Sequence, residues 1–329
     1  MNHEKILENI DQSSAWITWE IQIRNRSMAA LLNIPLHELI VNRHRAIRYP
    51  ILIFKTLYIL CKNDIRILFV QNPSIVLSML AVLFASIRNM KVIVDAHNSG
   101  IYPLEGRSKL LSWIARYIAR KADAVIVSNS YLASAVELWG ATPIVMPDPV
   151  PNLHEAEKIT SERPYLFFIC TWAADEPYLE IIEAAKLIPE TIDIYITGKY
   201  RNKLSQTQLD ALPSNIKLLG FVPEHDYIAY FSSCLMAIDL TTRDNCLVCG
   251  AYEALSLEKP CIVSNSKVNR EIFSTGFVYT DNNATAIAAS INQGLHNLKQ
   301  LNIDIATQAK SHRSLIEKQV FELKRILNS

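Results

Sequence analysis

Short apolar runs rich in β-branched and aromatic residues alternate with longer helical patterns along the chain. Runs of this kind are typical of buried strands, and apolar positions spaced three and four apart are typical of the helices that cover them. In the first half we expect strands at residues 15–20, 38–41, 65–72, 91–98, 124–129 and 143–148, with helices at 27–33, 49–63, 74–87, 108–121 and 130–140. This alternation predicts a parallel sheet with helices on both faces.

The second half repeats the alternation after a break. Residues 147–164 are rich in proline and charge and show neither period, so they predict a linker. Further strands are expected at 165–172, 193–198, 216–221, 235–241, 260–265 and 277–280, with helices at 176–188, 224–234 and 249–258. We therefore predict an α/β chain with two Rossmann-like, doubly wound parallel-sheet domains and a C-terminal helical tail. The predicted parts are an N-terminal domain at 1–150, a linker at 151–164, a second domain at 165–310, and a helix at 311–329 that packs back on the N-terminal domain.

Length and composition agree with two globular domains. The chain has 329 residues, half of them apolar and a fifth charged, which is more than one hydrophobic core usually holds. The net charge of +1 gives no sign of the strongly basic surface that binds nucleic acid. Residues 1–150 hold 16 basic and 11 acidic side chains, and the remainder holds 17 basic and 21 acidic ones. A mildly basic first half is thus joined to a mildly acidic second half.

The termini and cysteines bear on location. Residues 1–14 contain acidic side chains and no continuous apolar run, so we expect no secretory signal and a cytoplasmic protein. The apolar segment 74–87 is shorter than the ~20 residues that a membrane-spanning helix needs.

Most of the six cysteines should be reduced core residues. Cys246 and Cys249 form one CxxC pair, but two further ligands are missing, and we expect no metal site.

The carboxyl ends of parallel strands are where ligands bind in open α/β sheets. After the strand at 235–241, a helix is expected to open at Cys249, Gly250 and Ala251, with Glu253 in its first turn. Backbone N–H groups at such a helix start bind phosphate, and the helix dipole favours the anion. Glu253 is a candidate acceptor of hydrogen bonds from ribose hydroxyls. The alternative is a carboxylate that only complements the helix N-terminus.

The same segment resembles the donor-binding core of the GT4 glycosyltransferases, a family with the two-domain GT-B fold. Glu253, Ala254, Lys259, Pro260 and Ser264 match the second half of the family's motif, E-x7-E followed by AxxxGxPVVAS, and residues 213–240 resemble another family segment. The motif's first glutamate is replaced by Asn245, with Asp244 beside it. Either Asn245 or Asp244 then contacts the sugar hydroxyls, or the group that does so lies elsewhere in this chain.

The opening of the second domain departs from the family. Relatives carry an arginine and a lysine after its first strand to bind the diphosphate, whereas this chain has Asp175 and Glu176. The replacement cation is then expected to be Lys199 or Arg243, each just after a strand. A solvated loop lysine is the alternative for Lys199. Thr171 and Gly198 end neighbouring strands and complete the candidate donor contacts.

In the first domain, His97 ends the strand at 91–98 and matches the family's strand-ending histidine that faces the transferred sugar. Asp95 is expected on the opposite face of this strand. A satisfied core or turn histidine is the alternative. The candidate acceptor contacts are Glu20, Arg24 and Arg26 in a loop before the helix at 27–33, together with Asn72 and Asn98. Solvated charges at a helix start are the alternative for the arginines.

A basic amphipathic helix is predicted at 108–121, with Lys109, Arg116 and Arg120 on one face. Such a helix can lie on an anionic membrane surface, and the alternative is an ordinary core-facing helix with a solvated side. Three further arginines, at positions 43, 45 and 48, add to the basic first half. Peripheral association with the inner face of a membrane is therefore one hypothesis.

Together with these patterns, the resemblance implies a glycosyltransferase of the hexosyltransferase type that moves a sugar from a UDP-sugar or GDP-sugar to a glycan or glycolipid acceptor. No DxD motif occurs in the chain, so we expect no metal ion and no other cofactor. The resemblance implies retention of configuration and a role in bacterial surface polysaccharide or lipopolysaccharide synthesis. Two alternatives remain: a GT-B-fold sugar-nucleotide epimerase or hydrolase, which needs no acceptor, and a non-catalytic two-domain sugar-binding protein.

Overall fold

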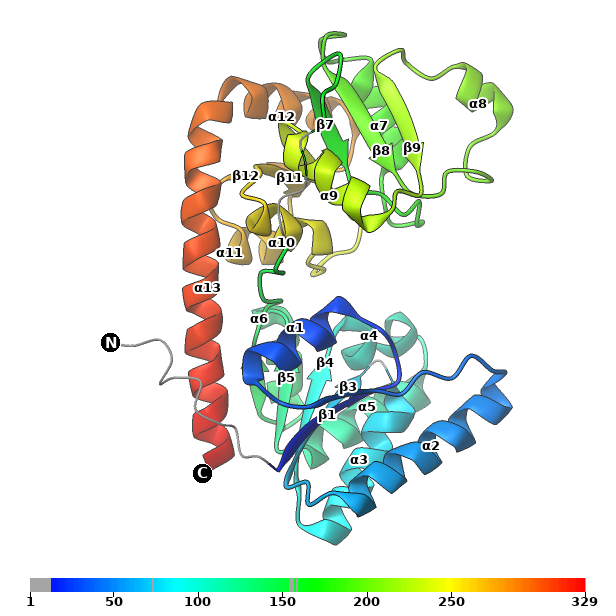
Figure 1. Ribbon diagram of the computed structural model, residues 1–329, viewed down its shortest axis with the longest axis vertical. Helices are drawn as coiled ribbons and strands as arrows, with labels where there is room; N and C mark the ends of the chain where they lie inside the picture. The colour runs from blue at the N-terminus through cyan, green and yellow to red at the C-terminus, as the bar shows by residue number, and fades with distance from the viewer. Residues whose placement is uncertain (1–12, 73, 154–156, 158, 329) are drawn as a thin grey trace. The chain divides into compact units, whose positions relative to one another are not determined.

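The protein consists of two compact units. A computed structural model describes residues 13–72, 74–153, 157 and 159–328. One unit runs to Pro149 and takes in the chain again from Ser314, and the other is Val150–Arg313. Each unit is a sheet with helices on both faces (Figure 1). Residues 1–12, considered above for a secretory signal, and residues 154–156 and 158 of the predicted linker lie outside the described residues.

The first unit is built on six parallel strands among its described residues, in the order β2-β1-β3-β4-β5-β6. The strands are β1 Ser14–Thr18, β2 Leu36–Glu38, β3 Ile67–Asn72, β4 Lys91–Ala96, β5 Ala124–Val127 and β6 Pro143–Val145. The helices are α1 Ile23–Leu32, α2 Arg45–Lys62, α3 Ile75–Arg88, α4 Asn98–Ile101, the 3-10 turn η2 Pro103–Gly106, α5 Lys109–Lys121 and α6 Ser130–Leu138.

The second unit has the strand order β12-β11-β10-β7-β8-β9, again six parallel strands within the described part. The strands are β7 Tyr165–Phe168, β8 Asp193–Thr197, β9 Ile216–Gly220, β10 Met236–Asp239, β11 Cys261–Ser264 and β12 Phe277–Thr280. The helices are α7 Tyr178–Ala185, α8 Gln206–Asp210, α9 Glu224–Ser233, α10 Cys249–Ser256, α11 Lys267–Ile272, α12 Ala284–His296 and α13 Leu298–Asn328. Counted within the unit, this is the Rossmann order 3-2-1-4-5-6.

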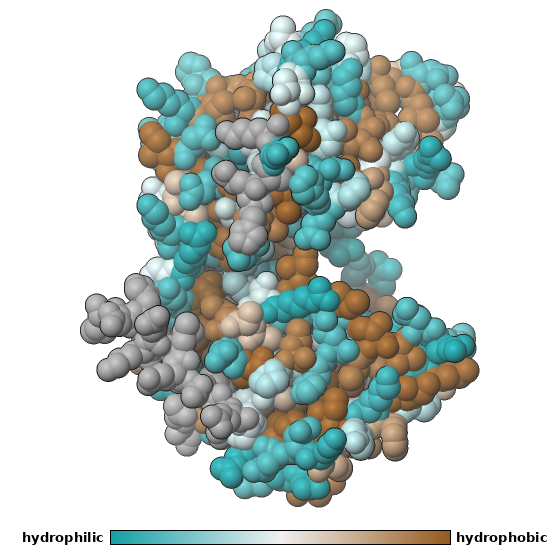
Figure 2. Space-filling view, viewed as in Figure 1, coloured by the Kyte–Doolittle hydropathy of each residue, from teal (hydrophilic) through white to brown (hydrophobic). Residues whose placement is uncertain are grey.

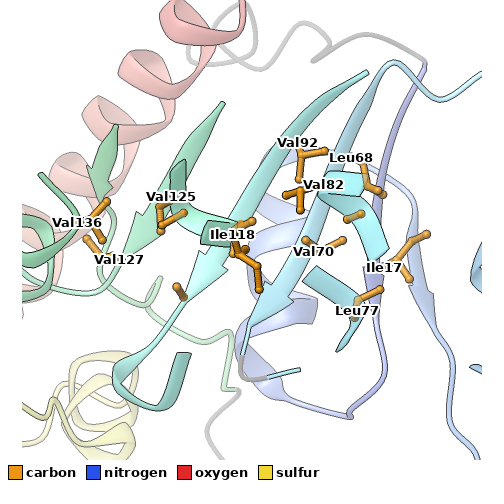
Figure 3. Packing of buried hydrophobic residues seen from close by; sticks show 14 of the residues in the cluster. Ile17, Leu68, Val70, Leu77, Val82, Val92, Ile118, Val125, Val127 and Val136 are labelled. Carbon is orange, nitrogen blue, oxygen red and sulfur yellow. The ribbon is translucent and has the colours of Figure 1, made fainter. Parts of the chain in front are cut away.

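Alternate strand residues of the first sheet enter two different cores, because successive side chains point to opposite faces. Val92 and Val94 of β4 face the core formed by α2, α3, α5 and α6, whereas Ile93 between them faces the core that contains α1. Figure 3 shows the first of these cores, in which strand residues such as Leu68 and Val125 meet the helices. Strands buried on both faces read as continuous apolar runs, which is why the sequence predicted them.

Helix α13 contributes to the cores of both units. Ile305 and Ala309, in its first half, pack in the core of the second unit that contains α10 and α11. Ile316, Val320 and Leu323 pack in the first unit's core beside Trp16. The helix begins at Leu298, so the terminal part predicted at 311–329 is the second half of one long helix.

The predicted fold class is confirmed, but some element boundaries were wrong. Helix α1 begins at Ile23, so the segment that holds Arg24 and Arg26 is helix rather than loop. Its N-cap, Gln22, makes no side-chain cap hydrogen bond, so the sequence carried no start signal. Strand β2 is Leu36–Glu38 instead of 38–41. Helix α4 lies where a loop was expected.

No helix in the described part of the chain combines the length and apolar content needed to cross a membrane.

Gly276 tests the packing of α13 on the second unit. This glycine has φ +77°, and a Cβ atom placed on it would lie 2.4 Å from the Cα of Ile305 in α13. Gly220 has a similar φ of +72° with nothing within 4 Å of such an atom. We expect Gly220→Ala to lose about 1–2 kcal/mol of unfolding free energy from backbone strain alone, and Gly276→Ala to lose a further 1–3 kcal/mol or so from the collision.

The measurement is urea unfolding of both variants. Equal losses in the two variants would show that α13 does not pack against this turn.

Candidate functional site

In each sheet the strand order reverses direction at one point, and ligands of open α/β sheets bind outside the carboxyl ends of the strands there. In the second unit this point lies between β7 and β10, and in the first between β1 and β3. Thr171 and Arg243 follow β7 and β10. Asn72 ends β3, and His97 follows the next strand, β4. These four candidate residues therefore lie at the carboxyl edges of the two sheets.

The loop after β7 is held in its conformation by hydrogen bonds to a carboxylate of the same chain. Glu176 accepts hydrogen bonds from the backbone N–H groups of Thr171 and Ala173, both at 2.9 Å, and from Thr171 Oγ1 at 2.8 Å. Trp172, between them, has φ +63°, and its indole Nε1 donates to the carbonyl of Thr197 at 2.8 Å. The polar groups predicted to bind the donor at Thr171 are thus engaged by Glu176 in this structure.

The adjacent end of β8 comes close to this loop because of Gly198. This residue has φ +89°, and a Cβ atom on it would lie 2.1 Å from the carbonyl oxygen of Cys170. Only glycine fits this position. Lys199 follows, with Nζ 5.4 Å from the centre of the Phe221 ring. It is a cation at the carboxyl edge that rests on an aromatic face rather than on a carboxylate.

Asp239, at the end of β10, holds the start of α10. Its carboxylate is buried and accepts a 2.7 Å hydrogen bond from the Gly250 N–H. A Cβ atom on Gly250 would lie 2.5 Å from that carboxylate oxygen, so glycine is needed for this approach. Burial raises the pKa of Asp239 well above its usual value, and the charge of nearby Glu253 adds to the rise. One of the N–H groups predicted to meet a phosphate is therefore bonded to Asp239.

The other residues at this helix start differ in their access. Cys249, which opens α10, is exposed, and Ala251 is fully buried. Of these two residues, Cys249 is therefore the one that a ligand can reach in this structure.

Glu253 is the fifth residue of α10 and so lies beyond the first turn where it was predicted. Its Oε2 accepts a 2.5 Å hydrogen bond from the Tyr227 hydroxyl of α9. Burial raises the pKa of Glu253, although the bond from Tyr227 lowers it. Burial and the Glu253 charge together raise the pKa of Tyr227 well above its usual range, so the phenol stays protonated and donates. Among the described residues, Oε1 of Glu253 has no hydrogen-bond partner.

Arg243 lies at the switch point of the second sheet. Its Nε is 3.2 Å from Oδ2 of Asp175, an oxygen that also accepts from Thr241 Oγ1 at 3.0 Å. The arginine side chain is 61% exposed, so most of the guanidinium faces solvent. Asp244 follows as an exposed residue, and Asn245 has φ +60°. Asparagine tolerates this left-handed conformation better than most residues.

A buried ion pair occupies the carboxyl edge of the first sheet. Arg24, from α1, donates to Asp95 of β4, with Nη2 to Oδ1 at 2.8 Å and Nε to Oδ2 at 3.0 Å. It also donates to the carbonyl of Met146 at 3.0 Å and to Asp148. Burial lowers the pKa of Arg24, but the two carboxylates outweigh it and hold the pKa above its usual value. Arg24, predicted as an acceptor contact, is turned into the protein.

His97 lies beside this pair. Its Nε2 is 3.7 Å from Asp95 Oδ2, and 27% of the side chain is exposed. The expectation that Asp95 faces away was wrong, because residues two apart in a strand share a face. Burial lowers the pKa of His97, and the Asp95 charge only partly opposes this. The imidazole is therefore neutral at neutral pH and can donate and accept hydrogen bonds.

The remaining acceptor candidates differ in environment. Asn72 is buried, its Nδ2 donates to the Gly100 carbonyl at 3.4 Å, and its Oδ1 is buried with no hydrogen-bond partner. Asn98 is half-buried at the start of α4. Arg26 forms a two-bond pair with Glu38 at the exposed side of α1. Glu20 is half-buried and accepts from Gln22 Nε2 at 3.3 Å.

Two of the three basic side chains on the basic face of α5 contact other residues of the first unit. The guanidinium of Arg116 lies 5.7 Å from the centre of the Trp139 ring, and Arg120 Nε donates to the Trp139 carbonyl at 2.5 Å. This arrangement favours the alternative of an ordinary core-facing helix for residues 108–121.

Among the described residues there is no group of three or more His, Cys, Asp or Glu side chains placed to hold a metal ion.

Three residues of these edges were not predicted from the sequence: Asp239, Tyr227 and Asp148. Asp239 had a usable signal, since an acidic residue inside the apolar run 235–241 must find a donor when buried. Tyr227 and Asp148 lie far along the chain from their partners, and no local pattern marks them.

Comparison with known proteins supports this description of the second unit. Residues 150–312 match the model of the family described as glycosyl transferases group 1. No curated protein matches the chain.

Solved structures share the whole architecture at low sequence identity. The sucrose-phosphate synthase of Thermosynechococcus elongatus is 14% identical with a TM-score of 0.74, over 96% of this chain and 99% of that one. HepE of Anabaena in complex with UDP-glucose is 14% identical with a TM-score of 0.71, over 95% and 99%. The lipopolysaccharide outer core galactosyltransferase WaaB is 11% identical with a TM-score of 0.64, over 94% and 98%.

These similarities confirm the GT-B fold expected from the resemblance, and the family match gives the class of enzyme. The chain has the GT-B fold, and its residues 150–312 match the glycosyl transferases group 1 family, which makes it a glycosyltransferase.

Proposed function

We propose that the protein transfers a sugar from a UDP-sugar or GDP-sugar to a glycan or glycolipid acceptor. The observation that carries the proposal is the carboxyl edge of the second sheet. Three groups lie there: the start of α10, the Glu253 carboxylate oxygen that has no partner in the described chain, and the largely exposed Arg243. All three belong to the segment that matches the group 1 family. The likeness to HepE in complex with UDP-glucose supports a nucleotide sugar as the donor.

In this proposal the ribose and the diphosphate are bound by different groups. Glu253 Oε1 accepts from ribose hydroxyls while Tyr227 fixes the other carboxylate oxygen. The N-terminal end of the α10 dipole stabilises the negative charge that grows on the departing diphosphate. Arg243 and Lys199, the cations of this edge, supply the remaining positive charge. Asn245 or Asp244, at the position of the family's first glutamate, contacts the transferred sugar.

The acceptor binds at the first unit, next to His97. A neutral imidazole at the end of β4 can hydrogen-bond a sugar hydroxyl and stabilise charge that develops on it. Asn72, which ends β3, and Asn98, which opens α4 directly after His97, are the further candidates at this edge. The proposed reaction uses no metal ion and retains the anomeric configuration, the latter resting on the family resemblance.

The biological setting is proposed on the same basis. Resemblance to the family, together with structural similarity to a lipopolysaccharide outer core galactosyltransferase, favours synthesis of a bacterial surface polysaccharide or lipopolysaccharide. We place this reaction in the cytoplasm, at the inner face of the membrane.

A transfer assay tests the proposed function. The full chain is incubated with a panel of UDP-sugars and GDP-sugars and with glycan and glycolipid acceptors, in excess EDTA, and products are identified by mass spectrometry. We expect an acceptor that has gained one sugar. Consumption of the nucleotide sugar without any glycosylated acceptor would favour the epimerase or hydrolase alternative, and activity restored only by Mn²⁺ or Mg²⁺ would refute the metal-free reaction.

Glu253→Ala tests the ribose contact. Loss of a hydrogen bond to a charged group is worth about 1.5–3 kcal/mol, so nucleotide affinity should fall roughly tenfold to a hundredfold by calorimetry. Tyr227→Phe is the matched control, because it removes the same internal hydrogen bond and leaves the carboxylate. If both variants lose affinity equally, Glu253 acts through the packing of α9 on α10 and not on the ribose.

His97→Ala tests the contact with the transferred sugar. We expect kcat to fall by about 10² to 10³ while nucleotide affinity stays the same, as for loss of one preorganised polar contact. Because the pKa of His97 is lowered, the acid limb of kcat attributable to it should lie below the 6.5 of an ordinary histidine. His296→Ala, at an exposed histidine that ends α12, is the control. A lower melting temperature with a rate that falls only in step with the folded fraction would make His97 a core residue.

A further inference from the structure

Helix α2 carries apolar side chains on two opposite faces. Leu52 and Leu60 are buried in the core of the first unit, as is the side chain of Thr56. A second set points away from the core and is exposed: Ile47, Ile51, Phe54 and Tyr58. At 100° per residue these four exposed positions lie within an arc of about 60°, on the side of the helix opposite the buried face. Folding requires only the first face.

The exposed face lies among basic residues. No acidic side chain occurs between Leu39 and Asn63, whereas this stretch holds five basic ones: Arg43, Arg45, Arg48, Lys55 and Lys62. All except the half-buried Arg48 are exposed. Lys62 Nζ lies 5.6 Å from the centre of the Tyr58 ring. The space-filling view shows hydrophobic surface over the part of the first unit where α2 lies (Figure 2).

We propose that this face of α2 inserts into the headgroup region of an anionic lipid bilayer, and that it is the surface that brings the enzyme to its membrane. An apolar stripe with exposed aromatic rings and lysines beside it is the pattern of a helix that lies in a membrane interface. The rings enter the boundary of the acyl chains, and the lysine stems extend so that their charges reach lipid phosphates. The site is on α2 rather than on the basic face of α5 that the sequence suggested.

Charge favours the bilayer over a second copy of the chain. A twofold contact through this face would bring the same basic side chains of two molecules together without an acidic residue of the helix to pair with them. An anionic bilayer supplies the opposite charge and an apolar interior at once. The inference deepens the proposed role at a membrane and rests on it for its biological meaning, but the binding itself needs neither donor nor acceptor.

Vesicle flotation of the full chain tests the proposal. The chain should float with vesicles of phosphatidylglycerol and phosphatidylcholine in equal parts and much less with phosphatidylcholine alone. Phe54→Ser should lower the partition coefficient at least about tenfold, since a buried phenylalanine contributes strongly to transfer out of water. Lys55→Gln and Lys62→Gln should each lower it about fivefold on the anionic vesicles.

Phe321→Ser is the matched control, because Phe321 is also an exposed helical phenylalanine, 59% against 71% for Phe54, and lies on α13. Tyr58→Ser is a second test variant for use if Phe54→Ser melts early. No flotation of the wild type, or equal flotation of Phe54→Ser and Phe321→Ser, would overturn the proposal. Self-association in sedimentation equilibrium that Phe54→Ser abolishes would assign the face to a second copy instead. A chain that floats but transfers no sugar would leave this surface standing and refute the proposed function alone.

Discussion

The buried ion pair between Arg24 and Asp95 determines the arrangement of the first unit's carboxyl edge. Taking two charges out of water costs several kcal/mol per ion, and further hydrogen bonds around the pair offset part of this cost. Asp95 accepts from two guanidinium nitrogens, and the rest of the guanidinium is taken up by the Met146 carbonyl and by Asp148. These contacts tie α1, β4 and the segment after β6 together at one place. Removal of either partner would leave an uncompensated charge in the interior.

The electrostatics of His97 depend on this pair. A free Asp95 carboxylate 3.7 Å from the imidazole would favour the imidazolium, but here its charge is shared with Arg24. Burial raises the pKa of Asp95, yet Arg24 outweighs burial and keeps it below the usual value, so the carboxylate remains ionised. His97 then lies beside Asp95, Arg24 and Asp148, and burial is the largest influence on its pKa and lowers it. In the described part of the second unit, the carboxylates of Glu176 and Asp239 are stabilised chiefly by hydrogen bonds from backbone N–H groups and not by a buried cation.

Much of this architecture could be predicted from the sequence because both sheets are parallel and covered on two sides. Strands such as β12 and helices such as α5 stand out as apolar runs and periodic segments, and their bounds were nearly correct. The start of α1 could not be predicted, since Gln22 provides no capping side chain. This hid the fact that Arg24 is in a helix and points toward β4.

The candidate site was predictable at the level of strand ends and not at the level of contacts. His97 and Arg243 were placed at the carboxyl edges because strand ends are visible in the sequence. The partners that set their chemistry lie far away along the chain: Tyr227 is 26 residues from Glu253, and Asp148 is 124 residues from Arg24. The exposed face of α2 was missed because an apolar residue looks the same in a sequence whether it faces the core or the solvent.

The most direct test of this account is the protonation of His97. In protein labelled with ¹³C at histidine Cε1, the His97 resonance can be assigned by its loss in His97→Gln and followed by NMR from neutral to acidic pH. The account predicts a titration midpoint below the 6.5 of an ordinary histidine, since the Asp95 charge is shared with Arg24. A midpoint above 6.5 would show that Asp95 acts on His97 as a free carboxylate, and would contradict the ion pair as the basis of the site.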